Sequence, residues 1–174
     1  MKVVLGVCAG IAAYKATFLV RAFKEAGHDV KVVPTENSYN FIGKATWEAL
    51  SGNKVTSNVF DDVENINHVK VAKEADVIIV TPATANFIAK TRAGLADDLL
   101  SDIMLMATCP IILAPAMHTE MWNNPATQEN VKILKERGFK IFGPASGRLT
   151  GKDTGNGRME EPVDIYKFVM EIMQ

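Results

Sequence analysis

The residues best suited to chemistry follow the apolar run Val77–Val80, where threonine, proline and asparagine replace branched aliphatic side chains. Such a run is typical of a buried strand, and ligand-binding loops follow the carboxyl ends of strands in open α/β sheets. Pro82 lacks an N–H group and ends the strand, while Thr84 and Asn86 offer a hydroxyl and an amide near a helix start. These two side chains either bind a ligand or cap the helix, and the segment alone does not decide between the alternatives.

A second polar loop, Pro115–Trp122, follows the apolar run Pro110–Ala114 and contains a histidine, a glutamate and two methionines. These side chains are unusual for a plain connector. Near the N-terminus, the run Lys2–Cys8 leads into Ala9–Ala13, whose small residues would let backbone N–H groups approach an anion at a helix start. Gly10 alone does not make the G-x-G-x-x-G dinucleotide fingerprint, so a tight turn of small residues explains this segment equally well.

Three further sets of side chains each have more than one interpretation. Thr35 and Ser38 either reach the same anion or cap a short helix. His68 lies beside a predicted helix start, where a lone histidine is a surface or capping residue or a proton acceptor. Asp97 and Asp98 suggest metal binding or acid–base chemistry, but near a helix start the helix dipole explains paired carboxylates better.

Apolar runs alternate with amphipathic helical patterns, and this order predicts an α/β fold with a doubly wound parallel sheet in a single domain, residues 1–174. The expected strands are Lys2–Cys8, Val30–Pro34, Val77–Val80, Pro110–Ala114 and Lys140–Gly143. The expected helices are Tyr14–Ala26, Thr46–Leu50, Val69–Ala75, Gly94–Thr108, Pro125–Arg137 and Glu161–Met173. In such a sheet the loops Ala9–Ala13, Thr81–Asn86 and Pro115–Trp122 share one edge, which predicts a small-molecule or cofactor pocket there.

Two segments are harder to assign. The segment Ser146–Arg158 contains four glycines and little apolar mass, which predicts a mobile loop, either an active-site flap or a disordered connector. The segment Lys54–Asp62 has weak strand character and fits a small extra strand.

The composition excludes several functional classes. The net charge of −1 gives no polybasic surface for nucleic acid or an anionic membrane, and no apolar run is long enough to span a bilayer. Cys8 and Cys109 cannot form a disulfide framework, and no signal-peptide pattern follows Met1, so we expect a cytoplasmic protein.

Several longer motifs resemble, in order and spacing, those of the flavin-containing cysteine decarboxylase family. They are GIAAYK at 10–15, NHV at 67–69, TPATANFIAKTRAGLADDLLS at 81–101, PAMHTEMW at 115–122 and SGRLTGKDTGNGRM at 146–159. The chain is most similar to the branch formed by the phosphopantothenoylcysteine decarboxylase domains of coenzyme A biosynthesis. The resemblance implies a Rossmann-like flavoprotein with FMN at a subunit interface of a homotrimer, often assembled into a dodecamer. It also implies a substrate ending in cysteine and, in many members, a fused phosphopantothenate–cysteine ligase.

The resemblance also assigns roles to residues of this chain. His68 matches the essential active-site histidine. His118 takes the position of an asparagine that contacts the substrate carboxylate, and we expect it to donate a hydrogen bond or a positive charge there. The implied reaction oxidises the terminal CH2–SH group to a thioaldehyde, with hydride going to FMN, and CO2 then leaves. The implied cofactor-binding residues are Ala9, Gly10, Ile11, Thr35, Ser38, Thr81, Thr84, Asn86 and Met117. The implied substrate-binding residues are Asn67, His118, Met121, Lys152 and Asp153, and no metal site is expected.

Two positions depart from the family pattern. His118 stands where many members have an asparagine, and Gly151 stands where many coenzyme A enzymes have a flap cysteine that acts as an acid. Without that thiol, another donor such as Lys152 or Asp153 must serve, or the reaction stops at the enethiol. One alternative is therefore a peptidyl-cysteine decarboxylase, which acts on a peptide C-terminus and releases an enethiol. Another is a non-catalytic flavin-binding regulatory subunit. The missing glycine fingerprint disfavours a nicotinamide-dependent dehydrogenase.

Overall fold

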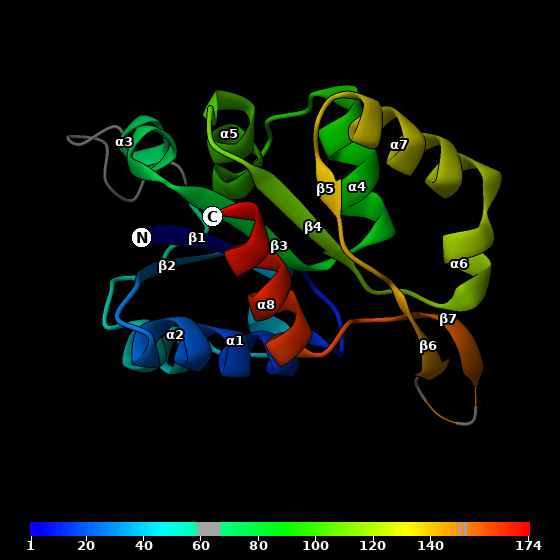
Figure 1. The fold of residues 1–174 in the computed structure, drawn as a ribbon, viewed down its shortest axis with the longest axis horizontal. Coiled ribbons are helices and arrows are strands. Elements are labelled where there is room, and N and C mark those ends of the chain that lie inside the picture. Colours follow the sequence, from blue (N-terminus) through cyan, green and yellow to red (C-terminus); the bar gives the residue numbers. More distant parts are fainter. Residues whose placement is uncertain (59–66, 150, 152) are drawn as a thin grey trace.

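The computed structural model describes residues 1–58, 67–149, 151 and 153–174 and contains a sheet of five parallel strands (Figure 1). In spatial order these are β2 (Asp29–Pro34), β1 (Lys2–Val7), β3 (Val77–Ala83), β4 (Ile111–Pro115) and β5 (Lys140–Ile141). The strand order reverses direction between β1 and β3, which makes the sheet doubly wound and places the switch point there. The predicted fold class is therefore confirmed.

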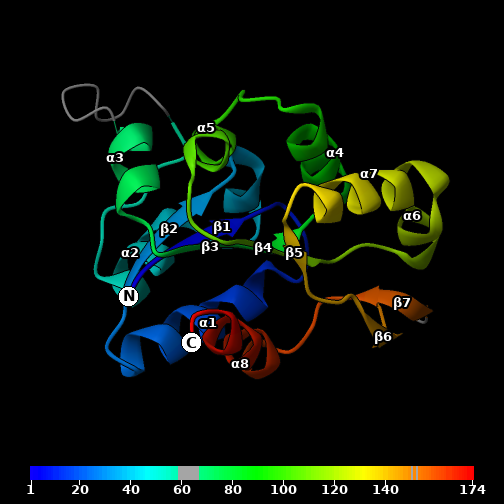
Figure 2. The same cartoon turned by 45° about the horizontal axis from the view of Figure 1, so that its top comes forward.

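Helices cover both faces of the sheet (Figures 1 and 2). One face carries α1 (Ala13–Glu25), α2 (Lys44–Ser51) and α8 (Pro162–Ile172). The other carries α3 (Asn67–Glu74), α4 (Ala85–Ala93), α5 (Leu99–Met106) and α7 (Pro125–Glu136). The 3-10 helix η1 (Glu36–Asn40) follows β2, and the short α6 (Thr119–Asn123) follows β4. Two clusters of buried apolar side chains fill the spaces on either side of the sheet.

The central strands explain why the sheet holds its loops rigidly. All seven residues of β3 are buried, as expected for a strand between two helical layers. In β1, Gly6 allows α5 to pack closely, because a Cβ atom there would lie only 2.7 Å from Cδ1 of Leu100. The loops that leave these strands therefore start from fixed positions.

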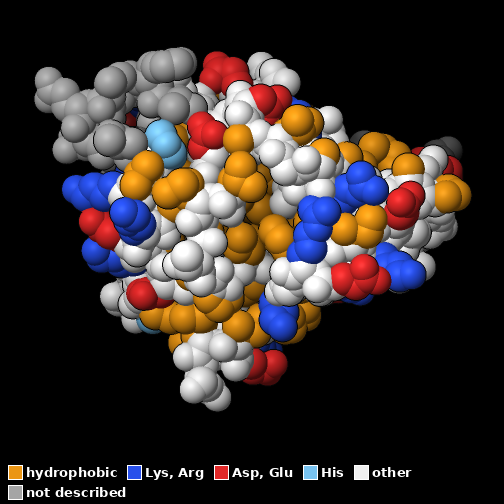
Figure 3. Space-filling model, turned by 90° about the horizontal axis from the view of Figure 1, so that it is seen from above, with side chains coloured by type: hydrophobic (Ala, Val, Ile, Leu, Met, Phe, Trp, Pro, Cys, Tyr) orange, Lys and Arg blue, Asp and Glu red, His pale blue; other side chains and the backbone are white. Residues whose placement is uncertain are grey.

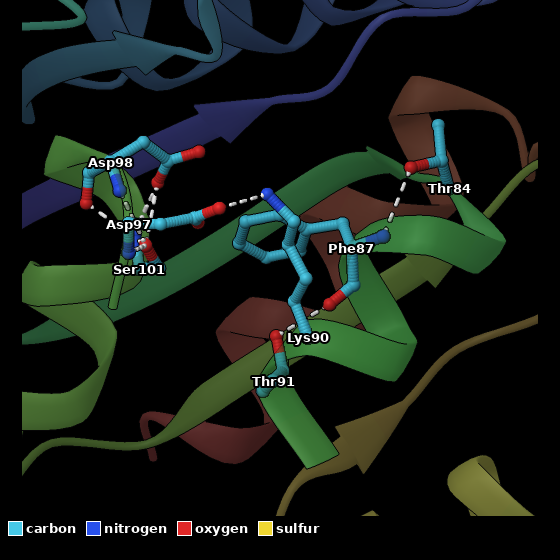
Figure 4. Close-up of polar contacts among 7 residues, drawn as sticks. All are labelled: Thr84, Phe87, Lys90, Thr91, Asp97, Asp98 and Ser101. Atoms are coloured by element: carbon cyan, nitrogen blue, oxygen red, sulfur yellow. Dashed lines mark hydrogen bonds and ion pairs between the residues drawn. The ribbon is translucent and has the colours of Figure 1, made fainter. Parts of the chain in front are cut away.

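The predicted helix Gly94–Thr108 is wrong at its start, because α5 begins only at Leu99. Gly94 ends α4 with a φ of 72°, and Asp98 starts the next helix with a capping box, in which its carboxylate accepts from the Ser101 N–H at 2.8 Å (Figure 4). Asp97 instead forms an ion pair with Lys90 of α4 (Figure 4). The two carboxylates thus stabilise a helix start and a contact between helices.

The expectation of a loop at Ser146–Arg158 is wrong for the described residues, which form two strands, whereas the active-site flap stays a prediction. β6 (Ala145–Arg148) and β7 (Thr154–Arg158) form an antiparallel hairpin, drawn in orange in Figure 1. Three of its glycines have φ angles that residues with a side chain rarely adopt, 153° at Gly157 for example. Of the expected extra strand, residues 54–58 are not in a strand and residues 59–62 lie outside the described part of the chain.

The remaining predicted elements are present, with ends that differ by a few residues. Figure 3 shows the face formed by α3, α4, α5 and α7, where acidic and basic side chains are interspersed with apolar ones. Among the described residues, every helix is too short or too polar to cross a bilayer.

Candidate active site at the carboxyl edge of the sheet

A cavity of about 610 Å³ opens at the carboxyl edge of the sheet, beside the switch point between β1 and β3. Its walls come from the turn before α1, the start of α4, the loop after β4 and the hairpin β6–β7. The lining residues that these segments contribute are Ala9–Ala12, Tyr14, Lys15, Thr84, Ala85, Ala116–His118, Met121, Arg148, Leu149 and Gly157–Met159. The three loops that the sequence placed at one edge therefore meet in one cavity.

The start of α1 borders the cavity and has no side-chain cap. Ala12 is the N-cap residue, no side chain caps the helix, and the first turn contains no acidic residue. The first N–H groups of a helix carry a partial positive charge and need an acceptor. The Ala13 N–H already donates to the Gly10 carbonyl at 2.9 Å and the Lys15 N–H to the Ala12 carbonyl at 3.0 Å. Because Ala9–Ala12 line the cavity, a phosphate group bound there would meet the other N–H groups of this turn.

The polar residues at the end of β3 and the start of α4 have different surroundings. Oγ1 of Thr84 accepts from the Phe87 N–H at 3.3 Å and caps α4 (Figure 4), and Thr84 also lines the cavity. Thr81 is fully buried and donates to Sδ of Met159 at 3.4 Å. Asn86 is exposed in the first turn of α4 and does not line the cavity.

The hydroxyl groups after β2 are engaged with the backbone. Ser38 is fully buried and donates to the Thr35 carbonyl at 2.7 Å, while Thr35 donates to the Val7 carbonyl at 3.4 Å. Neither residue lines the cavity. Their assignment to the cofactor stays a prediction.

The hairpin is seated directly on the loop that carries Met117 and His118. The Met117 N–H donates to the Gly157 carbonyl at 2.9 Å. A Cβ atom at Gly157 would lie 2.1 Å from the Met117 carbonyl oxygen, and one at Gly155 would lie 2.3 Å from Oγ1 of Thr119. Glycine is therefore required at both positions for this contact.

Across this contact, a histidine faces a carboxylate. Nδ1 of His118 lies 3.9 Å from Oδ2 of Asp153, which stands at the tip of the hairpin. Both side chains remain open to solvent, with 48% and 72% of their surface exposed. His118 lines the cavity, whereas Lys152, the neighbouring residue that the sequence also suggested, lies outside the described residues.

An ion-pair network that the sequence reading missed joins α1 to the end of the hairpin. Nζ of Lys15 donates to Oε1 of Glu161 at 2.8 Å and to the Met159 carbonyl at 3.4 Å, and Arg158 contacts the same carboxylate oxygen. Lys15 is the buried member, with 8% of its surface exposed. The signal was available, because Lys15 lies among Ala13, Ala16 and Leu19 on the buried stripe of α1 and needs a partner there.

The hydrogen bond from Lys15, with the charges of Lys15 and Arg158, holds the pKa of Glu161 below its ordinary value. A lowered folded-state pKa contributes stability above the unfolded-state pKa, and this stability is lost as the pH falls through the folded value. We therefore expect Glu161→Gln to lower the free energy of unfolding at pH 7 by about 1 kcal/mol, since the pair is partly exposed and screened. In urea unfolding, the difference in free energy of unfolding between the wild type and the variant should shrink towards pH 3. A difference that does not change with pH would contradict the assignment.

The second sequence-predicted catalytic residue lies on another element. His68 is half-buried in the first turn of α3, which confirms its place at a helix start, and none of the described residues that line the cavity belongs to α3. Asn67 begins the same helix. A single chain therefore does not bring His68 into the cavity with His118.

Neither cysteine is suited to chemistry in the cavity. Burial raises the pKa of the Cys8 thiol to about 12, and burial also raises the pKa of Cys109. Neither residue lines the cavity. Within the described residues, no group of three or more His, Cys, Asp or Glu side chains is arranged to hold a metal ion.

Comparison with known proteins places these features in a family. The flavoprotein family model matches residues 1–174. The coenzyme A biosynthesis bifunctional protein CoaBC of Mycolicibacterium smegmatis is 54% identical over 99% of this chain, which spans only 42% of that relative's length. A solved PPC decarboxylase mutant, C175S, complexed with pantothenoylaminoethenethiol, is 32% identical with a TM-score of 0.89, covering 98% of this chain and 97% of its own.

The solved FMN-dependent cysteine decarboxylase SpaF is 26% identical with a TM-score of 0.84, covering 99% of this chain and 97% of its own. These similarities cover 98–99% of this chain. The chain therefore belongs to the flavoprotein family, among the flavin-containing cysteine decarboxylases.

Proposed function

We propose that residues 1–174 form an FMN-dependent decarboxylase domain that removes the carboxylate of a terminal cysteine. The preferred substrate is 4′-phosphopantothenoylcysteine and the product 4′-phosphopantetheine, the step that coenzyme A biosynthesis requires. The observation that carries this proposal is the cavity at the β1–β3 switch point, where the three motif loops and the hairpin meet. The similarity to PPC decarboxylase over 97% of that chain supports the choice of substrate.

The residues present fit FMN. The cavity of about 610 Å³ lies within the range of roughly 300–1,000 Å³ typical of ligand pockets, and its lining is mainly apolar, as a flavin ring needs. The uncapped start of α1 at Ala9–Ala12 would hold the phosphate, and Met117 would lie against the ring. Thr35, Ser38, Thr81 and Asn86 stay in the proposal as residues near the cofactor. Bound FMN would supply the removal and return of hydride at the cysteine methylene.

The chain's own groups would position the substrate and move protons. His118 lies at the cavity wall and would bind the substrate carboxylate, with Met121 forming an apolar wall beside it. His68 would act as proton acceptor at the reacting cysteine, and Asn67 would orient the substrate. The ordered hairpin would limit the access of water to the reacting carbon.

We further propose a homo-oligomer in which His68 of one copy completes the cavity of another. Three observations support it: His68 lies on α3, the cavity lining excludes α3, and apolar side chains are exposed at the cavity, Ile11 with 65% and Met121 with 47% of their surface. A trimer, alone or within a dodecamer, provides such a contact. A ligase acting before this enzyme, fused or separate, and a cytoplasmic location complete the proposal.

Ala12→Asp is expected to weaken FMN binding about 10- to 100-fold, because it places a carboxylate where the proposal puts the cofactor phosphate. Fluorescence titration of the apo-protein with FMN measures this change. The matched control is Ala12→Asn, which has the same size without the charge and should bind FMN far more tightly than the aspartate variant. Equal affinities of the two variants would place the phosphate elsewhere.

The test of the proposed function is to incubate the purified protein with phosphopantothenoylcysteine and, separately, with peptides ending in cysteine. We expect CO2, a saturated thiol and oxidised flavin from the first substrate. An enethiol and bleached flavin from the peptides alone would favour the peptidyl-cysteine decarboxylase alternative, which the glycine at position 151 supports. Yellow protein that releases no CO2 from either substrate would identify a regulatory flavin-binding subunit and refute the proposal.

A further inference from the structure

The pair formed by His118 and Asp153 connects two parts of the chain that are distant in sequence. His118 is the N-cap residue of α6 and lines the cavity, while Asp153 belongs to the hairpin that covers it. The 3.9 Å between Nδ1 and Oδ2 is an ion-pair distance. If Nδ1 faces the carboxylate, the opposite ring nitrogen, Nε2, is left for a ligand in the cavity.

Asp153 is held in place from both ends of the hairpin tip. The Leu149 N–H donates to the Asp153 carbonyl at 2.8 Å, and Nε of Arg148 donates to the Gly151 carbonyl at 3.0 Å. At its base the hairpin is fixed by the hydrogen bond between Met117 and Gly157. These contacts fix the main chain of Asp153 beside the loop that carries His118, and its side chain reaches the imidazole from there.

The proposed reaction, on which this inference rests, needs a proton at one particular carbon. When the bond from Cα to the carboxylate breaks, its electron pair forms a Cα–Cβ double bond and the C=S group becomes a thiolate. To reach a saturated product, Cα must take up a proton, the electron pair returns to C=S, and the hydride and thiol proton removed at the start are restored. The net change replaces CO2 with one proton at Cα.

Within one chain the cavity offers few donors for this proton. His68 of a neighbouring copy would hold the thiol proton, which has to return to sulfur. The described lining of the cavity contains the ionisable residues Tyr14, Lys15, His118, Arg148 and Arg158. Tyrosine, lysine and arginine side chains ordinarily release protons only far above neutrality, whereas imidazole does so near pH 7. The thiols of Cys8 and Cys109 do not line the cavity, and the ammonium group of Lys15 forms an ion pair with Glu161.

We infer that His118, as an imidazolium with Nδ1–H towards Asp153, donates its Nε2 proton to the carbon that loses the carboxylate. Asp153 positions the ring for this step, and the transfer leaves His118 in the neutral Nδ1–H form. The group that binds the carboxylate lies beside Cα when CO2 leaves, so binding and proton donation need no rearrangement. This pair takes the place of a flap thiol in a chain with glycine at position 151, and it directs the reaction to the saturated thiol.

The matched test variant is His118→Asn, because asparagine can still donate a hydrogen bond to the substrate carboxylate but cannot deliver a proton. Mass spectrometry of the products from phosphopantothenoylcysteine should show the ratio of saturated thiol to enethiol falling about 10²-fold in this variant. Asp153→Asn should lower the same ratio about tenfold, and Asp153→Glu should restore most of it. An unchanged ratio in His118→Asn, or in Asp153→Asn, would overturn the corresponding assignment.

A second readout does not depend on turnover. In the flavin-free protein, ¹⁵N spectra of the three histidine side chains distinguish the ring nitrogen that carries the proton, and the His118→Asn variant identifies the His118 signals. We expect His118 to favour the Nδ1–H form in the wild type and to lose this preference in Asp153→Asn. The same spectrum in both proteins would contradict the positioning role. Wild-type protein that releases no CO2 would instead refute the proposed function, and the inference with it.

Discussion

Replacement of His68 by asparagine is expected to lower the rate of CO2 release about 10²- to 10⁴-fold, because asparagine keeps the size and polarity of the side chain but cannot accept the proton. The side chain is half-buried in the first turn of α3, so the fold should tolerate this change. Initial rates with phosphopantothenoylcysteine measure the effect, and the flavin content of the variant serves as the control for assembly. A variant with wild-type turnover would remove His68 from the mechanism.

A mixing experiment then tests where His68 acts. The His68→Asn and Ala12→Asp chains carry different affinity tags and are co-expressed, and mixed assemblies are isolated by purification on both tags. In a ring of three copies, about one third of the sites combine an intact His68 with an intact cavity, so about a third of wild-type activity should return. The assay uses an FMN concentration too low to load the Ala12→Asp chain. Mixed assemblies as inactive as the parent variants under this condition would show that each chain supplies a complete site.

The second large effect is expected from Gly157→Ala. Its Cβ atom would lie 2.1 Å from the Met117 carbonyl oxygen. Because this oxygen belongs to the backbone and cannot rotate away, the hairpin must move away from the loop after β4. The Met117–Gly157 hydrogen bond is then lost and Asp153 moves away from His118. We expect turnover to fall about 10²-fold, because catalytic groups must stay within a fraction of an ångström of their working positions.

Gly147→Ala is the matched control for this variant. Gly147 lies in the same hairpin with a similar φ, 157° against 153°, but its Cβ would meet only the flexible side chain of Arg158, at 3.2 Å. Both variants therefore carry a similar energetic cost of placing alanine at a strongly positive φ. Only Gly157→Ala adds a clash with backbone atoms of Met117. Equal turnover in both variants would show that the contact between the hairpin and Met117 has no role in catalysis.

The sequence predicted the parts of the molecule that local patterns determine. The buried run in β3 and the capped start of α4 follow from hydrophobicity and turn chemistry alone. The expectation that Pro82 ends the strand is wrong, because β3 continues through Pro82 to Ala83. The meeting of three loops at one edge follows from parallel strand topology. The start of α5 was missed because apolar periodicity continues through Gly94, although the glycine and the Asp98–Ser101 capping box mark the boundary.

The missed features of the site depend on contacts between distant residues. The hairpin contacts the loop after β4 through the hydrogen bond from the Met117 N–H to the Gly157 carbonyl. A glycine-rich composition alone does not distinguish such a hairpin from a loop. Lys15 and Glu161, which form an ion pair, are 146 residues apart in the sequence. His118, on the loop after β4, pairs with Asp153 at the tip of the hairpin. Composition and spacing do not encode these pairings, because tertiary packing creates them.

The most direct measurement is the crystal structure of the protein loaded with FMN. It should show the phosphate at the uncapped start of α1, the flavin ring in the cavity against Met117, and His68 of a neighbouring copy in contact with that ring. Flavin density outside this cavity, or a His68 side chain that reaches no flavin in the assembly, would contradict the proposed active site.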